Sequence, residues 1–302
     1  MSTNNRTGRK RDYVGVLSSV FAIVIGLLVG FVILLICNPS QALPGFVTIL
    51  TGAFTHGLKG VGQVFYYATP IILTGLSVGF AFKTGLFNIG TPGQFIVGAF
   101  AAVYVGIMWT GLGRIQWAVA LLAAILGGAL WGMVPGFLKA CFNVNEVIAS
   151  IMMNYIGMYM VNWIVKSYKP LFNNLRNESR NVAATAQIPK MGMDKLFPES
   201  SVGGGILLAI AAVLIIWVIL NKTTFGYELK AVGFNRDASR YAGINEKRNI
   251  IMSMVIAGAI AGMAGGLLYL AGTGKHIEIK DVLASEGFTG ISVALLVFSS
   301  PT

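Results

Sequence analysis

The apolar segments of this sequence hold few side chains that could do acid–base or metal chemistry. The chain has 11 Asp and Glu residues among 302, and only Glu146 adjoins an apolar run. The motifs HExxH and GxSxG and the Walker A lysine loop are absent. Neither His56 nor His276 has a cluster of metal ligands beside it. The sequence therefore predicts no catalytic residue and no metal site, and the lack of a carboxylate relay argues against an ion-driven pump.

The polar side chains that remain inside the apolar segments are amides. Asn88 and Gln94 lie in the stretch GLFNIGTPGQ, and Asn154 lies well inside an apolar run. An amide donates and accepts hydrogen bonds without carrying charge, which suits a path for an uncharged polar solute. Two interpretations stay open for each residue: a group on a translocation path, or a hydrogen bond within a turn or to a neighbouring helix.

The stretch GLFNIGTPGQ also predicts that one helix stops and another starts. Lys83 closes the first helix and Gly85 suits its C′ position. Thr91 is expected as the next N-cap, with Pro92 at N1 and Gln94 at N3 in a capping box. Backbone between two such helices has free polar groups, which survive at membrane depth only when buried in protein or lining a wet cavity.

A second stretch with helix start and stop residues is TTFGYELKAVGFNRDASRYAGINEKRN. Asn235 is expected to cap a short amphipathic helix over 236–242, and Gly243 is expected to end it. Asn145 and Glu146 likewise predict a capped helix start. Definite start and stop residues favour a docking element for a partner over a plain connector.

The length of the apolar runs predicts a membrane protein. Hydrophobic residues make up 55% of the chain and charged residues 11%, whereas soluble domains average about 25% charged residues. Each full run suits a helix of the ~20 residues that cross a bilayer, and none alternates as barrel strands do. The fold class is predicted as all-α, a polytopic transmembrane helical bundle of about 7–8 spans with broken or re-entrant segments, in one domain over 1–302. The runs are 14–37, 61–82, 95–109, 116–138, 147–165, 204–220, 251–271 and the short 289–298, with 38–60 interfacial or re-entrant.

Charges between the runs predict the topology. Basic residues in 1–13 place the N-terminus in the cytoplasm. Alternation of the spans then places 83–91, 139–146 and 221–249 inside and makes 166–203 an extracytoplasmic loop, although that loop also carries Lys and Arg. The net charge of +11 is ascribed to cytoplasmic loops rather than to nucleic-acid binding.

Small residues recur four apart in two of the runs. Gly258, Gly262 and Gly266 share one helix face, as do Gly128 and Gly132. Such faces allow close backbone approach between helices in a membrane. They predict tight internal packing or, alternatively, a face for a second subunit.

Three stretches together resemble permease subunits of ATP-binding-cassette importers: GLSVGFAFKTGLFNIGTPGQFIVGAF, NEVIASIMMNYI and TFGYELKAVGFNRDASRYAGI. Within the branch for branched-chain amino acids, ribose-type sugars and nucleosides, they resemble bacterial nucleoside and simple-sugar permeases most. The resemblance covers roughly 61–296. It implies a multi-pass protein of the bacterial cell membrane without catalytic residues, in which two permease subunits form the path.

The resemblance also implies partners and site residues. A cytoplasmic ATP-binding subunit would hold ATP and Mg, this chain would bind no cofactor, and a substrate-binding lipoprotein or periplasmic protein would deliver the solute. The 221–249 loop would couple to the ATPase, with polar contacts from Arg236, Asp237 and Arg240. The coupling residues would be Gly226, Glu228, Gly233, Asn235, Arg236, Asp237, Ala238, Arg240, Ala242 and Gly243, and the path residues Asn88, Gln94 and Asn154.

The sequence departs from the family pattern at two places. Pro92 stands where relatives carry an acidic residue, and relatives continue with further spans after VALL. The run 289–298 is roughly half of a ~20-residue span, so a C-terminal truncation is expected. The alternatives are an ion-gradient-driven secondary transporter and a truncated, non-transporting remnant.

Overall fold

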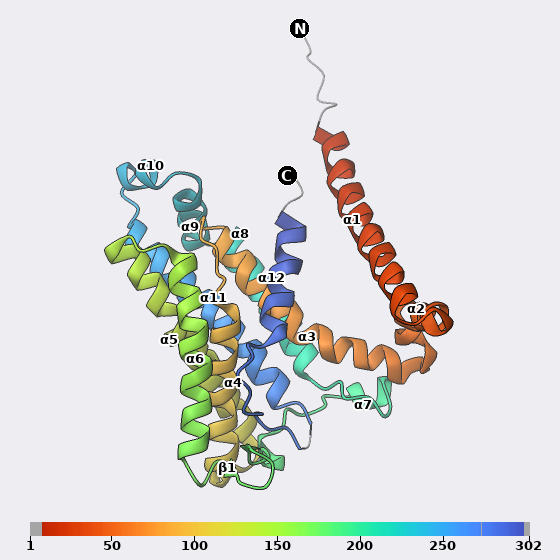
Figure 1. The fold of residues 1–302 in the computed structure, drawn as a ribbon. Helices are drawn as coiled ribbons and strands as arrows, with labels where there is room; N and C mark the ends of the chain where they lie inside the picture. The colour runs from red at the N-terminus through yellow and green to blue at the C-terminus, as the bar shows by residue number, and fades with distance from the viewer. Residues whose placement is uncertain (1–7, 273, 299–302) are drawn as a thin grey trace.

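The computed structural model describes residues 8–272 and 274–298 as a bundle of helices (Figure 1). The predicted 1–13 tail lies partly outside these residues, and a helix already begins at Gly8. The elements are α1 (Gly8–Cys37), α2 (Pro39–Thr55), α3 (Gly57–Phe82), α4 (Thr91–Met108), η1 (Thr110–Ile115), α5 (Gln116–Phe142), α6 (Glu146–Ser167), β1 (Phe172–Asn173), β2 (Glu178–Ser179), η2 (Ala184–Ala186), α7 (Met193–Leu196), α8 (Gly205–Lys222), α9 (Thr224–Phe234), α10 (Arg236–Tyr241), α11 (Glu246–Tyr269) and α12 (Ser285–Phe298).

Seven of the described helices are long and apolar enough to cross a membrane: α1, α3, α4, α5, α6, α8 and α11. Their outer faces are apolar. On α5, for example, Leu122, Leu126 and Leu130 recur every four residues and are all more than half exposed. Such faces are stable against lipid, where helices satisfy their own backbone groups. The predicted all-α polytopic bundle is therefore confirmed.

The centre of the bundle is the contact between α5 and α11. A Cβ on Gly128 would lie 2.2 Å from the Gly258 carbonyl oxygen, and a Cβ on Gly262 would lie 2.3 Å from the Ala124 carbonyl oxygen. Only glycine permits this approach of the two backbones. The predicted small-residue faces thus serve internal packing, and Gly128 and Gly258 do not form a face for a second subunit.

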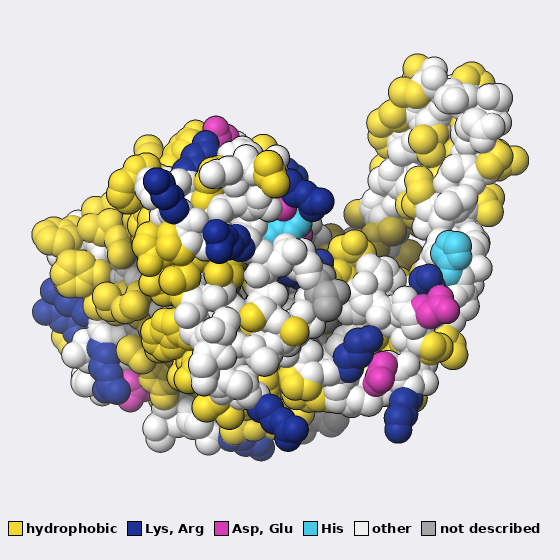
Figure 2. Space-filling model, turned by 90° about the horizontal axis from the view of Figure 1, so that it is seen from below, with side chains coloured by type: hydrophobic (Ala, Val, Ile, Leu, Met, Phe, Trp, Pro, Cys, Tyr) yellow, Lys and Arg dark blue, Asp and Glu magenta, His cyan; other side chains and the backbone are white. Residues whose placement is uncertain are grey.

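Polar connections gather at the two ends of the bundle. The ends of α3 and α5 lie with α9 and α10 at one end, and Figure 1 shows the first turns of α1 on the same side. The segment 168–204, with β1 and α7, covers the opposite end. Figure 2 looks onto that end and shows Lys and Arg side chains scattered over it, with apolar side chains around its margin. The segments 83–91, 139–146 and 221–249 thus lie at one end of the bundle and 168–204 at the other, while the side of the membrane that each end faces stays a prediction.

The predicted 221–249 loop is mostly helical. α8 extends to Lys222, α11 begins at Glu246, and α9 was not predicted at all. Thr223 starts α9 because its Oγ1 accepts the Gly226 N–H at 3.1 Å. The 168–204 segment is also ordered against the bundle, since Ile188 N–H donates to the Leu270 carbonyl at 3.0 Å.

Candidate functional site

Helix α3 ends in a glycine cap. Gly85 has a positive φ of 69°, a conformation that favours glycine. Its N–H donates to the Phe82 carbonyl at 3.0 Å, and the Leu86 N–H donates to the Ala81 carbonyl at 3.1 Å. This pair of bonds is a Schellman motif, so the predicted C′ position of Gly85 is confirmed. We refer to residues 83–91, between the two helices, as the α3–α4 break.

The predicted capping box at the start of α4 is wrong. Gly90 is the N-cap, and no side chain caps this helix. The Thr91 Oγ1 donates instead to the Asn88 carbonyl at 3.0 Å, and Gln94 bonds to the Asn88 side chain. Thr91 and Gln94 bond to Asn88 instead of capping the helix because Asn88 lies beside both residues in the interior. Pro92 does lie in the first turn, but at the second helical position rather than at the predicted N1, because Thr91 directly follows the N-cap.

Asn88 and Gln94 form a buried amide pair. Asn88 Nδ2 donates to Gln94 Oε1 at 2.9 Å, and Gln94 Nε2 donates to Asn88 Oδ1 at 3.1 Å. Asn88 Nδ2 also donates to Ser77 Oγ of α3 at 3.2 Å, and Ser77 Oγ donates to the Ala257 carbonyl of α11 at 2.6 Å. Both amides are at most 1% exposed. The structure brings these residues together in the packed interior, where they connect the break to two spans.

Asn154 of α6 bonds to the backbone of the break at Ile89 and to the backbone of the first turn of α4 at Gly93. Its Nδ2 donates to the Ile89 carbonyl at 3.0 Å, and its Oδ1 accepts the Gly93 N–H at 2.8 Å. Both backbone groups belong to the region where helical bonding is interrupted. Asn154 is 2% exposed, so it satisfies groups that would otherwise be buried without a partner. Of the two interpretations, the structure shows the bond to a neighbouring element.

The short helix α10 starts and ends as predicted. Asn235 Oδ1 accepts the Ala238 N–H at 3.0 Å. At the other end Gly243 has a φ of 81°, and the Ile244 N–H donates to the Ser239 carbonyl at 3.0 Å. Asn145 likewise caps α6, accepting the Val147 N–H at 2.9 Å. These local caps hold α10 as a defined corner next to α9.

The corner between α9 and α10 is open to solvent and largely apolar. A groove of 460 Å³ lies between the two helices, and Ala231, Ala238 and Ala242 are among the residues that line it. Phe234 is 91% exposed and Tyr241 is 94% exposed. The exposed aromatic side chains and the groove together form an apolar surface at this corner.

Charged residues flank this surface on α10. Asp237 and Arg240 are exposed, and Arg236 is half-buried. Within the described part of the chain, none of the three forms an ion pair. Arg236 nevertheless lies near enough to Glu146 for its charge to help lower the pKa of that carboxyl group.

Gly226 and Glu228 hold α9 against its neighbours. A Cβ on Gly226 would lie 2.2 Å from the Ile219 carbonyl oxygen of α8. Glu228 Oε2 accepts the Asn249 Nδ2 of α11 at 3.0 Å. Both residues thus position α9 from within the protein and leave its other face free.

The α9 helix touches the α3–α4 break directly. A Cβ on Gly233 would lie 2.4 Å from the Lys83 carbonyl oxygen and 3.1 Å from the Gly85 N. Around this contact, Ala81, Leu86, Val232, Ile250, Met254 and Ala257 form a buried apolar cluster. We call the approach of Gly233 to Lys83 and Gly85 the glycine contact. Because Lys83 and Gly85 lie within five residues of Asn88 in the chain, this contact connects the exposed α9–α10 corner with the buried amide pair.

Sequence reasoning missed the hydroxyl groups that complete this region. Thr84 Oγ1 donates to Ser253 Oγ at 2.8 Å between α3 and α11, and Ser77 bridges Asn88 to α11. Ser77 and Ser253 are small polar residues inside apolar runs, a pattern that was visible in the sequence, whereas Thr84 lies in the predicted loop 83–91. Gly233 was named, but its contact with a segment so distant in the chain could not be deduced.

The comparisons with known proteins agree with this architecture. The family described as "Branched-chain amino acid transport system / permease component" matches residues 60–298. The chain belongs to this family. It is 42% identical over 277 residues to "Guanosine ABC transporter permease protein NupP" of Bacillus subtilis (strain 168), covering 92% of this chain and 78% of that protein.

Two further relatives come from other organisms. "Nucleoside ABC transporter permease protein NupB" of Lactococcus lactis subsp. cremoris (strain MG1363) is 35% identical, over 99% of this chain and 80% of that protein. "Glucose ABC transporter permease protein TsgB13" of Haloferax volcanii is 31% identical, over 83% of this chain and 66% of that protein. No solved structure matches the chain.

Family membership and the seven spans together define the class of protein. The chain is a multi-pass membrane permease subunit of an ABC importer. A secondary transporter driven by an ion gradient is not favoured. The relatives are transport permeases, which agrees with a subunit that moves solute rather than one that catalyses a reaction.

Proposed function

We propose that this chain forms part of the path for a nucleoside and couples it to ATP hydrolysis on another subunit. The nucleoside class rests on two relatives of which the chain covers 78% and 80%, whose names give guanosine and nucleosides. The coupling rests on the glycine contact, because it connects an exposed docking surface to a break between two spans. That contact is the observation that carries the proposal.

The partners follow from this arrangement. A cytoplasmic ATP-binding subunit, holding ATP and Mg, docks on the α9–α10 corner. A second permease subunit completes the path, and an extracytoplasmic lipoprotein delivers the solute. The N-terminus and the α9–α10 corner then face the cytoplasm of a bacterial cell, and the 168–204 segment faces outward. The basic residues around α10 support this orientation.

The coupling residues have separate tasks in this proposal. Arg236, Asp237 and Arg240 meet charged groups of the ATPase, while Ala238 and Ala242 allow it to approach the groove closely. Asn235 and Gly243 keep α10 helical, so that it moves as one piece. Gly226, Glu228 and Gly233 transmit that movement to the spans, since their contacts are with α8, α11 and α3.

The path residues act through the break. Asn88 and Gln94 exchange hydrogen bonds with each other, and Asn154 bonds to the backbone of Ile89 in the break and of Gly93 in the first turn of α4. A shift of α9 against Gly85 would change the position of the break. We then expect the three amide side chains to face the solute, because each can exchange its hydrogen bonds within the protein for hydrogen bonds to the solute.

Replacement of 235–243 by a Gly/Ser linker tests the coupling surface. The variant should lose both co-purification with the ATPase and nucleoside uptake, while the permease still inserts in the membrane. Its control is a five-residue Gly/Ser linker in place of 173–177, which joins β1 to β2 at the opposite end of the bundle; this variant should still co-purify with the ATPase. Intact ATPase association and uptake in the 235–243 variant would refute the coupling assignment.

A further inference from the structure

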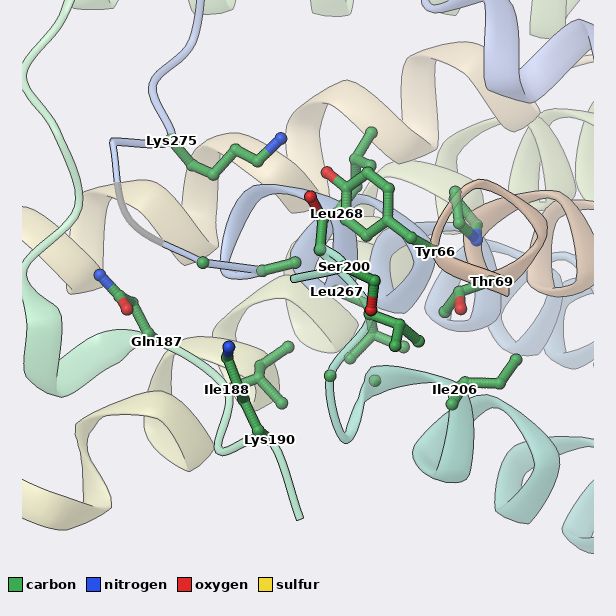
Figure 3. Close-up of a pocket in the computed structure, with 17 residues that line it drawn as sticks. Tyr66, Thr69, Gln187, Ile188, Lys190, Ser200, Ile206, Leu267, Leu268 and Lys275 are labelled. Carbon is green, nitrogen blue, oxygen red and sulfur yellow. The ribbon is translucent and has the colours of Figure 1, made fainter. Parts of the chain in front are cut away.

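A second cavity lies at the end of the bundle opposite α9 and α10. It occupies 460 Å³ between the first half of α3, the start of α8, the end of α11 and the 187–203 region. Figure 3 shows its labelled side chains converging from these elements. The volume is within the range of about 300–1,000 Å³ that small-molecule sites occupy.

One polar group in this cavity has no partner. Tyr66 is 6% exposed, and its buried Oη finds no hydrogen-bond partner among the described residues. A buried hydroxyl without a partner is unfavourable and is rare in folded proteins. The neighbouring Tyr67 is 57% exposed and does not line this cavity. The Tyr66 hydroxyl thus indicates a missing hydrogen-bonding group inside the cavity.

The charge around this hydroxyl is positive. Lys275 Nζ lies 5.0 Å from the centre of the Tyr66 ring, and Figure 3 shows the two side chains pointing toward each other. Lys190 also lines the cavity, and its described lining includes no Asp or Glu. A ligand here would therefore meet hydrogen-bond donors and would need to supply acceptors.

The remaining walls are apolar or bare backbone. Ile188, Ile206 and Leu267 are buried side chains on the lining, while Gly203 and Gly272 contribute no side chain. An apolar wall beside a few convergent donors suits a flat heterocycle with polar substituents. A purine such as guanine offers acceptors at N7 and O6, which lysine reads well.

We propose that this cavity receives the nucleoside on its way into the path, with Tyr66 Oη and Lys275 Nζ donating to acceptors on the solute. The assignment rests on the proposed function and adds a recognition site in the permease itself. Selection of the solute would then occur in the permease as well as in the protein that delivers it.

The test is binding of radiolabelled guanosine to the permease–ATPase complex in lipid nanodiscs. Tyr66→Phe removes only the hydroxyl and should raise the Kd roughly 3- to 10-fold, the equivalent of one hydrogen bond. Lys275→Gln should weaken binding as well. Tyr67→Phe is the matched control and should bind as the wild type does, and inorganic phosphate should not compete with guanosine.

Uptake by the same complex separates the two proposals. If the wild-type complex takes up guanosine but Tyr66→Phe binds it like Tyr67→Phe, the cavity assignment fails and the proposed function stands. Competition by millimolar phosphate would also overturn the assignment, because it would indicate an anion or lipid-headgroup site. If the wild-type complex takes up no nucleoside, the proposed function fails and the cavity assignment fails with it.

Discussion

At the scale of single residues, Asn154 has the most direct structural task. From a separate helix it bonds to one backbone acceptor of the α3–α4 break, at Ile89, and to one backbone donor in the first turn of α4, at Gly93. Asn154→Ala should lower the thermal stability of the purified permease and reduce uptake, since each buried backbone group left unpaired costs about 1–3 kcal/mol. The melting temperature in detergent measures the first effect.

Asn221→Ala is the control for this substitution. Asn221 is exposed, and its side chain bonds to the Trp217 carbonyl of its own helix and to Lys230 Nζ. It should change the melting temperature little. If Asn154→Ala were as stable as Asn221→Ala, the break would not depend on α6.

The amide pair makes a separate prediction. Because Asn88 and Gln94 share two hydrogen bonds, Asn88→Ala and Gln94→Ala should each impair uptake, and the double substitution should be little worse than either. A double-mutant cycle of initial uptake rates measures this coupling. Normal transport by both single variants would show that the stretch is only a well-formed turn.

Local residue patterns predicted some caps and not others. The caps at Asn145, Asn235, Gly85 and Gly243 depend on backbone within a few residues, so the sequence was sufficient to find them. Gln94 was misassigned because its partner is the Asn88 side chain, in a buried position that only the folded bundle creates. The spacing of residues in the sequence does not show whether a side chain bonds to the nearby backbone or to another buried side chain.

At the scale of elements, the glycine contact is the connection between α9 and α3. Gly233→Ala places a Cβ 2.4 Å from the Lys83 carbonyl oxygen, so α9 must move away from the break. The α10 surface is unchanged, and the ATPase should still bind. We expect ATP hydrolysis to continue while uptake falls at least tenfold, and parallel assays of both activities in proteoliposomes measure the ratio.

Gly52→Ala is the matched control for Gly233→Ala. Gly52 lies in α2, and a Cβ there would meet nothing within 4 Å, so transport per ATP should match the wild type. Equal coupling in the Gly233 and Gly52 variants would remove the glycine contact from the mechanism.

The helix α9 shows why element boundaries were harder to predict than spans. Its residues, including Gly226 and Gly233, were predicted to belong to the loop 221–249. Both glycines are instead required by close approach to the α8 and α3 backbones, and the helix is stabilised by those contacts. The spans were predictable because a long apolar run in a membrane has little alternative to a helix.

At the scale of the whole molecule, the α5–α11 contact supports the bundle. A Cβ on Gly258 would lie 2.3 Å from the Gly128 carbonyl oxygen. Gly258→Ala should therefore destabilise the permease by about 1–3 kcal/mol, as overpacking does, and lower its melting temperature. Gly30→Ala is the control because Gly30 of α1 has nothing within 4 Å of a Cβ; it should be neutral or slightly stabilising. Equal melting temperatures for both variants would contradict this packing.

The overall organisation of loops was also predictable from sequence. Alternation of the spans placed 83–91, 139–146 and 221–249 at one end, and the structure gathers them there. The cavity beside Tyr66 was not predictable, because its walls come from α3, α8, α11 and the 187–203 region. Such sites depend on how the helices assemble.

The energy source of transport tests the central claim most directly. Proteoliposomes containing this permease, its second permease subunit and the ATPase, with the delivery protein outside, would be loaded with ATP and Mg and given radiolabelled guanosine without any ion gradient. We predict uptake that requires internal ATP and does not occur when a proton or sodium gradient is imposed without ATP. Uptake driven by the gradient alone, or no dependence on ATP, would contradict the account.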